Sequence, residues 1–71
     1  MRGISAEDAQ RARAIGHRIT DARRAGDRDK ELHYRRSAEA MIAMVGQSGP
    51  EAQREIANGR REQLRRQKKW G

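Results

Sequence analysis

Residues 27–46 read DRDKELHYRRSAEAMIAMVG, and the run AMIAMV at positions 40–45 is the most hydrophobic stretch of the chain. Asp27 can accept a hydrogen bond from a free N–H group at a helix start, and its charge suits the positive end of the helix dipole. No Pro or Gly interrupts residues 28–45, and Gly46 then offers a left-handed stop. The segment therefore predicts a helix over 28–45 that organises the rest of the chain.

One face of this middle helix carries apolar side chains at helical spacing. The members of the stripe are Tyr34, Ala38, Met41, Ile42 and Val45. Leu32 and Met44 fall off the stripe, so the last two turns are apolar on nearly every side. A helix that is apolar all round needs more than one neighbour to cover it. We therefore expect the helices before and after the middle helix to wrap around it.

A first helix is predicted over residues 6–25. Ser5 is a favourable N-cap, and small or apolar residues recur after it at steps of three and four. These residues are Ala9, Ala12, Ile15, Gly16, Ile19 and Ala22. Gly16 lowers helix propensity by about 1 kcal/mol relative to Ala, which is consistent with a helix contact at that position. The short connection at residues 25–27 implies that the first two helices are antiparallel neighbours.

A third helix is predicted over residues 50–67, followed by a tail at 68–71. Pro50 suits the first turn of a helix, and Asn58 and Gly59 predict a kink or a break in its middle. The apolar content of this helix is low, being limited to Ala52, Ile56, Ala57 and Leu64. The expected fold is all-α and forms one small domain from the whole chain. It is either a three-helix bundle or a helical hairpin with a less firmly packed basic third helix.

The composition indicates a thin core and an intracellular protein. The chain has 71 residues, of which 34% are hydrophobic and 38% are charged, and it contains no Phe and no Cys. Small domains bury a small share of their surface, so we expect a homodimer or a bound partner to complete the core. The absence of Cys excludes disulfides and thiolate metal sites. No apolar run approaches the roughly 20 residues that span a bilayer, and no signal peptide is evident, so we expect a cytoplasmic location without membrane contact.

The net charge of +7 results from 17 basic and 10 acidic residues. The excess is unevenly distributed, because residues 1–26 carry a net +3, residues 27–46 are neutral and residues 47–71 carry a net +4. A positive excess favours anionic partners such as nucleic acid or an acidic protein.

Basic residues of the third helix form a stripe. Its members are spaced 7, 4 and 3 positions apart, and they are Arg54, Arg61, Arg65 and Lys68, flanked by Arg60, Arg66 and Lys69. On an α-helix the stripe is under about 70° wide and about 20 Å long. A stripe of this length can follow a phosphate backbone, with Arg making bidentate contacts. The leading hypothesis is a small accessory protein that binds nucleic acid, DNA rather than RNA, through this helix. Secondary contacts would come from Arg13, Arg18 and Arg24.

Two alternatives remain open. A basic helix face can simply be solvated, without any partner. In the other alternative, the protein is an adaptor or a homodimerising module that acts through the exposed apolar residues Leu32, Met44 and Trp70, without nucleic acid. Trp70 could anchor in a partner pocket or stack on a base, but folding back onto Leu64 or fraying is favoured over both.

The remaining polar residues do not form a recognisable catalytic set. His17 and His33 have no Cys to complete a metal site, so surface positions are expected for both. The acidic residues near the helix starts are explained by capping, and the serines have no identifiable base. We therefore expect no enzymatic activity, no metal, no cofactor and no small-molecule substrate.

Overall fold

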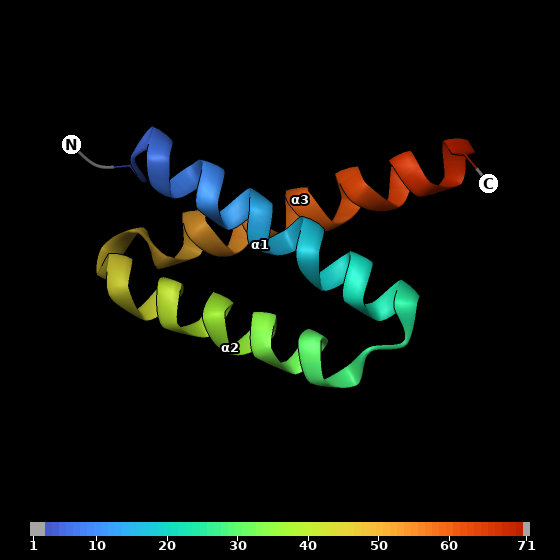
Figure 1. Ribbon diagram of the computed structural model, residues 1–71. Helices are drawn as coiled ribbons and strands as arrows, with labels where there is room; N and C mark the ends of the chain where they lie inside the picture. Colours follow the sequence, from blue (N-terminus) through green and yellow to red (C-terminus); the bar gives the residue numbers. More distant parts are fainter. Residues whose placement is uncertain (1–2, 71) are drawn as a thin grey trace.

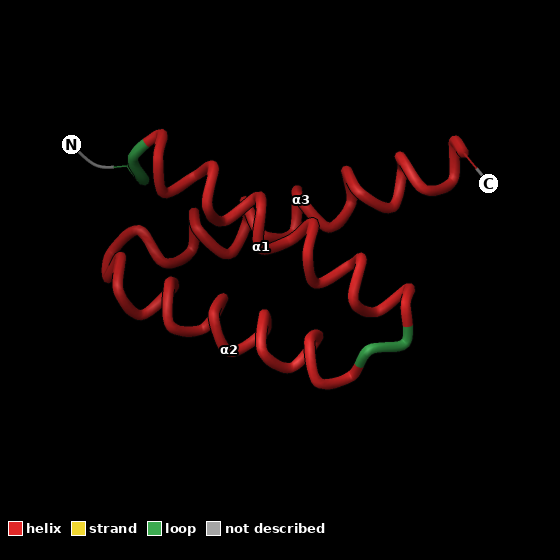
Figure 2. Tube along the Cα trace, viewed as in Figure 1, coloured by secondary structure: helices red, strands yellow, loops and turns green. Residues whose placement is uncertain are grey.

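A computed structural model of the chain describes residues 3–70, apart from the side chains of residues 69 and 70. Its elements in chain order are α1 (Ala6–Ala25), α2 (Arg28–Val45), the short 3₁₀ helix η1 (Gly46–Ser48) and α3 (Gly49–Trp70). Figure 1 shows α1 crossing α3 near the middle of both helices, with α2 running antiparallel to α1. Every described element is helical (Figure 2), so the prediction of a small all-α three-helix bundle is confirmed.

The first two helices have the predicted bounds and the predicted N-caps. At the start of α1, the Ser5 hydroxyl oxygen accepts a hydrogen bond of 3.1 Å from the backbone N–H of Asp8. At the start of α2, the Asp27 carboxylate accepts one of 3.1 Å from the backbone N–H of Lys30. Gly26 ends α1 in the left-handed conformation, with φ of 72°, where residues with a Cβ are strained. Local sequence signals therefore determine these two helices.

The third helix is longer than predicted and follows α2 almost directly. Gly46 ends α2 with a positive φ of 60°, but its ψ of −113° lies outside the left-handed helical conformation that the sequence predicts, and the chain leads directly into η1 and α3. Residues 68–70, predicted to be a tail, belong to α3, and Gly71 lies outside the described residues.

The core lies where α1 meets the two other helices, with α1 between them. The buried residues of this cluster are Ala12, Ile19, Ala38, Met41 and Ile56. Helix α1 packs most extensively against α3, less against α2, and α2 and α3 share the smallest contact. The central position that the sequence favours for residues 28–45 is thus occupied by α1.

Both neighbours contact α2, but they do not cover all its sides as expected. Its predicted apolar stripe does face the core, since Ala38 and Met41 are buried. However, Met44 is 75% exposed, and Ala40 and Ala43 are also exposed. The reason is that α3 packs against the small-residue face of α1, where two helices can approach most closely, and so leaves one side of α2 uncovered.

The crossing of α1 and α3 is built on two glycines. A Cβ placed on Gly16 would lie 2.2 Å from the backbone oxygen of Ile56, and one placed on Gly59 would lie 2.2 Å from the backbone oxygen of Arg13. Both positions are buried, and α3 continues through Asn58 and Gly59 without a break. Of the predicted kink or break, the break does not occur. Of the two expected arrangements, the bundle with a firmly packed third helix is the one adopted, because Gly59 lets α3 approach α1.

Candidate nucleic-acid interface

Two acidic residues of α3 point toward α1 and pair with basic side chains there. The Glu55 carboxylate accepts hydrogen bonds from Arg13 Nη2 at 2.8 Å and Arg13 Nε at 3.1 Å, and this carboxylate raises the pKa of Arg13. The Glu62 carboxylate lies 2.7 Å from His17 Nε2, and the hydrogen bond from His17 lowers the pKa of Glu62. His17 is therefore half-buried in a helix contact, and the expectation of a surface histidine is wrong for it.

The third acidic residue of α3 is also engaged with the N-terminal part of the chain. The Glu51 carboxylate accepts a hydrogen bond of 3.2 Å from the backbone N–H of Ile4. Farther along, the Asp21 carboxylate of α1 accepts hydrogen bonds from the side-chain amides of Gln63 at 2.8 Å and Gln67 at 2.9 Å. We call the row of polar pairs between Arg13, His17 and Asp21 of α1 and their partners on α3 the seam.

These contacts leave one face of α3 purely basic. Arg54, Arg61, Arg65 and Lys68 are all exposed, and we call them the basic face. Helical geometry at about 100° per residue puts the basic face opposite the buried residues Ala52, Ile56 and Gly59. Among the described residues, no member of the basic face forms an ion pair. The positive charge predicted for this side of α3 is therefore exposed to solvent and is not neutralised by the acids of its own helix.

The residues predicted to flank the basic face have different surroundings. Arg66 is exposed, whereas Arg60 is half-buried and its backbone oxygen accepts a hydrogen bond of 3.4 Å from the Thr20 hydroxyl. The side chain of Lys69 lies outside the described residues.

The predicted secondary contacts are also divided. Arg13 is held by Glu55, and Arg18 donates a hydrogen bond of 3.4 Å to the Tyr34 hydroxyl while its guanidinium lies 5.7 Å from the centre of that ring. Arg24 is exposed. Two of the three arginines thus join α1 to its neighbours.

The apolar residues predicted to bind a partner are exposed where the structure describes them. Leu32 is 49% exposed and Met44 is 75% exposed, and they lie near opposite ends of α2. The side chain of Trp70 lies outside the described residues.

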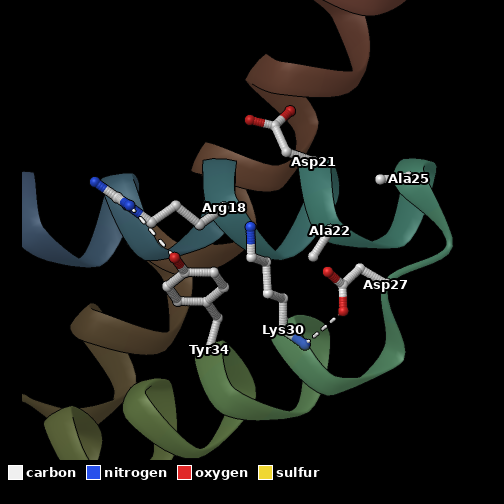
Figure 3. Close-up of a pocket in the computed structure, with 7 residues that line it drawn as sticks. All are labelled: Arg18, Asp21, Ala22, Ala25, Asp27, Lys30 and Tyr34. Carbon is white, nitrogen blue, oxygen red and sulfur yellow. Dashed lines mark hydrogen bonds between the residues drawn. The ribbon is translucent and has the colours of Figure 1, made fainter.

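A pocket of about 290 Å³ opens between α1 and α2, and Figure 3 shows the residues that line it. They are Arg18, Asp21, Ala22, Ala25, Asp27, Lys30 and Tyr34. Its charged groups balance, because Arg18 and Lys30 are matched by Asp21 and Asp27. The Asp21 carboxylate points toward α3 in Figure 3, in agreement with its role in the seam. This mixed pocket attracts an anion less strongly than the basic face does.

The described residues bear on metal ligation and on membrane crossing as well. Within residues 3–68, His, Asp and Glu side chains form no group of three placed to hold a metal ion. Across the described helices, none combines the length and the apolar character that crossing a bilayer demands. No family model, curated protein or solved structure matches the chain.

Proposed function

We propose that this protein binds nucleic acid through the basic face of α3, mainly by contacts to phosphate groups, with duplex DNA preferred over RNA. The observation that carries the proposal is the position of the three acidic residues of α3. Glu51, Glu55 and Glu62 are all engaged on the sides of the helix that meet α1 and the N-terminal segment. Because the carboxylates are drawn away, the basic face presents positive charge alone.

The dimensions of the basic face suit a phosphate backbone. From Arg54 to Lys68 it extends about 20 Å, which corresponds to about six base-pair steps along the axis of a duplex. Three of its four residues are arginines, whose guanidinium groups can bind a phosphate through two parallel hydrogen bonds. Binding of this kind depends on charge and geometry, so its affinity is expected to vary little with base sequence.

The preference for DNA rests on the shape of α3. Figure 1 shows the C-terminal turns of α3 extending away from α2, while Gln63 and Gln67 remain hydrogen-bonded to Asp21 of α1 and only the last turn projects beyond them. A projecting helix end fits the major groove of B-form DNA, which is about 12 Å wide, but not the narrow major groove of A-form RNA. The end of α3 holds Arg65, Arg66 and Lys68, so the groove would be entered by its basic part.

A salt titration with a fluorescent DNA duplex tests this proposal. If all four groups of the basic face contact phosphates, log K should fall against log salt with a slope of about −3 to −4. The double substitution Arg61→Glu with Arg65→Glu should reduce that slope by about two and weaken binding at least about tenfold, because two contacts are replaced by repulsion.

The control is the double substitution Arg11→Glu with Arg36→Glu. It makes the same change in net charge at exposed residues of α1 and α2. If the protein binds DNA through its overall charge alone, both double variants lose the same affinity, and the assignment to α3 is then wrong. Circular dichroism of each variant establishes that the helices are intact.

The exposed end of α2 supports a second candidate function, which is self-association. Ala40, Ala43 and Met44 are exposed there, and residues 37–45 contain a single charged side chain, Glu39. Two copies of the chain could meet at this end without bringing their basic residues together. The mass of the protein in solution tests this candidate, since Met44→Asp should convert a dimer to a monomer. A monomeric wild-type protein at high concentration would refute it.

A further inference from the structure

Two neighbouring hollows open on the part of the bundle where α2 and α3 diverge (Figure 1). The first has a volume of about 330 Å³, lies between α1 and α3, and is lined by Thr20, Arg23, Arg24, Arg60, Leu64 and Gln67. The second has a volume of about 480 Å³, lies between α1 and α2, and is lined by Arg23, Arg28, Glu31, Leu32 and Arg35. Arg23 lines both hollows, so they adjoin at this residue, and we call the two together the arginine groove.

Aliphatic side chains lie on both walls of the arginine groove. Leu64 of α3 is 50% exposed and Leu32 of α2 is 49% exposed. Only one other large apolar side chain, Met44, is exposed in the described part of the chain. Single exposed leucines are common, but two that line the same groove indicate a surface that is covered when a partner binds.

The rest of the groove is strongly basic. Five arginines line it, namely Arg23, Arg24, Arg28, Arg35 and Arg60. The single carboxylate among the lining residues belongs to Glu31, which pairs with Arg35 at 3.3 Å. The other four arginines have no carboxylate within 4.0 Å among the described residues. An occupant with complementary charge must therefore be acidic, and it must also have an apolar face for the leucines.

We propose that the arginine groove binds an acidic amphipathic helix of a partner protein. Leu32 lies between Arg28 and Arg35 at helical steps of four and three, and Leu64 lies between Arg60 and Gln67 at the same steps. Each wall thus has an apolar centre with polar groups one turn to either side. A bound helix would place its apolar stripe against the two leucines and its flanking carboxylates beside the arginines.

An acidic amphipathic helix fits the groove better than a nucleic acid or a second copy of the chain does. A nucleic acid would satisfy the arginines, but among the described side chains no aromatic residue lines the groove to stack with bases, and phosphates gain nothing from the leucines. A second copy of the chain would bring another net charge of +7 to a basic surface. The acidic helix is also independent of the proposed DNA contacts, because the four residues of the basic face do not line the groove.

The probe for this proposal is a fluorescein-labelled helical peptide of about 20 residues, with leucines on one face and glutamates on its flanks. Three comparison peptides separate the contributions: one with lysine in place of glutamate, one with the same residues in scrambled order, and a polyglutamate of equal length. Fluorescence anisotropy at near-physiological salt should show the probe binding at least about tenfold more tightly than each of them, because only the probe matches both features of the groove.

Two double variants assign the binding to the groove. Leu32→Ser with Leu64→Ser should weaken the probe at least about tenfold, whereas the control Met44→Ser should leave its affinity within about twofold. Arg24→Gln with Arg28→Gln tests the charged part independently of the leucines, and should also weaken binding. Circular dichroism establishes that each variant is folded.

Three results would overturn the proposal. They are equal binding of the scrambled peptide or polyglutamate, unchanged binding by both groove variants, and loss of duplex DNA binding on the leucine substitutions. The last result would show that the groove serves nucleic acid. If the peptide probe does not bind, this does not count against DNA binding by the basic face. The variant Leu32→Ser with Leu64→Ser retains all four basic side chains of that face.

Discussion

At the crossing of α1 and α3 the closest approach is made by two glycines, whereas the C-terminal half of α2 holds the most apolar run of the chain and exposes much of it. Gly16 and Gly59 are buried, yet neither contributes an apolar side chain. Met44 belongs to that apolar run and is 75% exposed. The two regions show that in this small bundle the position of a helix depends on how closely two backbones can approach, and not only on apolar content.

The difference has a physical basis in what each region gains from contact. Close backbone approach brings many atoms of α1 and α3 within van der Waals distance, and it also brings the polar groups of the seam into hydrogen-bonding range. The end of α2 can bury apolar area only if another surface covers it. Because α3 packs closely against α1, it covers only part of α2.

Gly59→Val should have the largest effect on stability. A Cβ at this position lies 2.2 Å from the backbone oxygen of Arg13, so the helices must separate to accommodate it. We expect a loss of at least about 3 kcal/mol in the free energy of unfolding, which is a large share of the stability of a small domain. Urea denaturation followed by circular dichroism measures the loss.

The smaller substitution Gly59→Ala gives a sharper test, because the sign of the resulting change in stability is informative. At an unconstrained helix position Ala stabilises by about 1 kcal/mol relative to Gly, so destabilisation here would identify the close contact with α1. The matched control is Ala57→Gly at an exposed position of the same helix, with an expected loss of about 1 kcal/mol. A rise in the urea midpoint for Gly59→Ala would contradict the crossing geometry.

Truncating one apolar side chain in each region should cause very different losses in the free energy of unfolding. Ile56 is 7% exposed at the α1–α3 contact, so Ile56→Ala should cost about 3 kcal/mol. Met44→Ala, at the exposed end of α2, should change stability by less than about 0.5 kcal/mol. The comparison is made by urea denaturation at several protein concentrations. Similar losses for both variants would show that the end of α2 is covered in solution, as self-association requires.

Acidification should weaken the seam by a smaller amount. The pKa of Glu62 is lowered from its ordinary value of 4.5, chiefly by the hydrogen bond from His17. A lowered pKa in the folded state means that the ionised Glu62 stabilises the fold above about pH 4.5 and that this contribution is lost as the pH falls through the folded-state value. The advantage of the wild type over Glu62→Gln should therefore shrink on acidification, as measured by urea midpoints across the pH range.

The control for the pH experiment is Glu39→Gln. Glu39 is exposed on α2 and forms no ion pair among the described residues, so its substitution should give a constant offset from the wild type. If the Glu62→Gln curve runs parallel to that of the wild type, then the pair with His17 makes no pH-dependent contribution. The effect is expected to be modest because both partners are partly exposed to solvent.

The sequence predicted the local features of the fold well. The bounds and N-caps of α1 and α2 were predictable because Ser5, Asp27 and the two helix-ending glycines act within a single turn. The outward position of Arg54 and Arg61 was also predictable, since helical periodicity sets which residues share a face. Whether the basic face binds DNA is a matter for the titration.

The sequence did not predict how the helices pack, because that depends on pairs of residues far apart in the chain. Gly16 and Gly59 each lower the helix propensity of their own segment, and only together do they form a crossing. A signal for the seam was present in the sequence. Arg13, His17 and Asp21 recur every four residues along one side of α1, opposite acidic and amide side chains of α3.

The seam also has a consequence for the synthesis of the protein. Its side-chain pairs join residues that are 42 to 46 positions apart in the chain. At a translation rate of about 5 to 20 residues per second, the part of α1 that forms the seam is synthesised roughly 2 to 9 seconds before its partners on α3. During that interval the most extensive helix contact of α1, the one with α3, cannot form. The last step of folding is therefore tied to the arrival of α3.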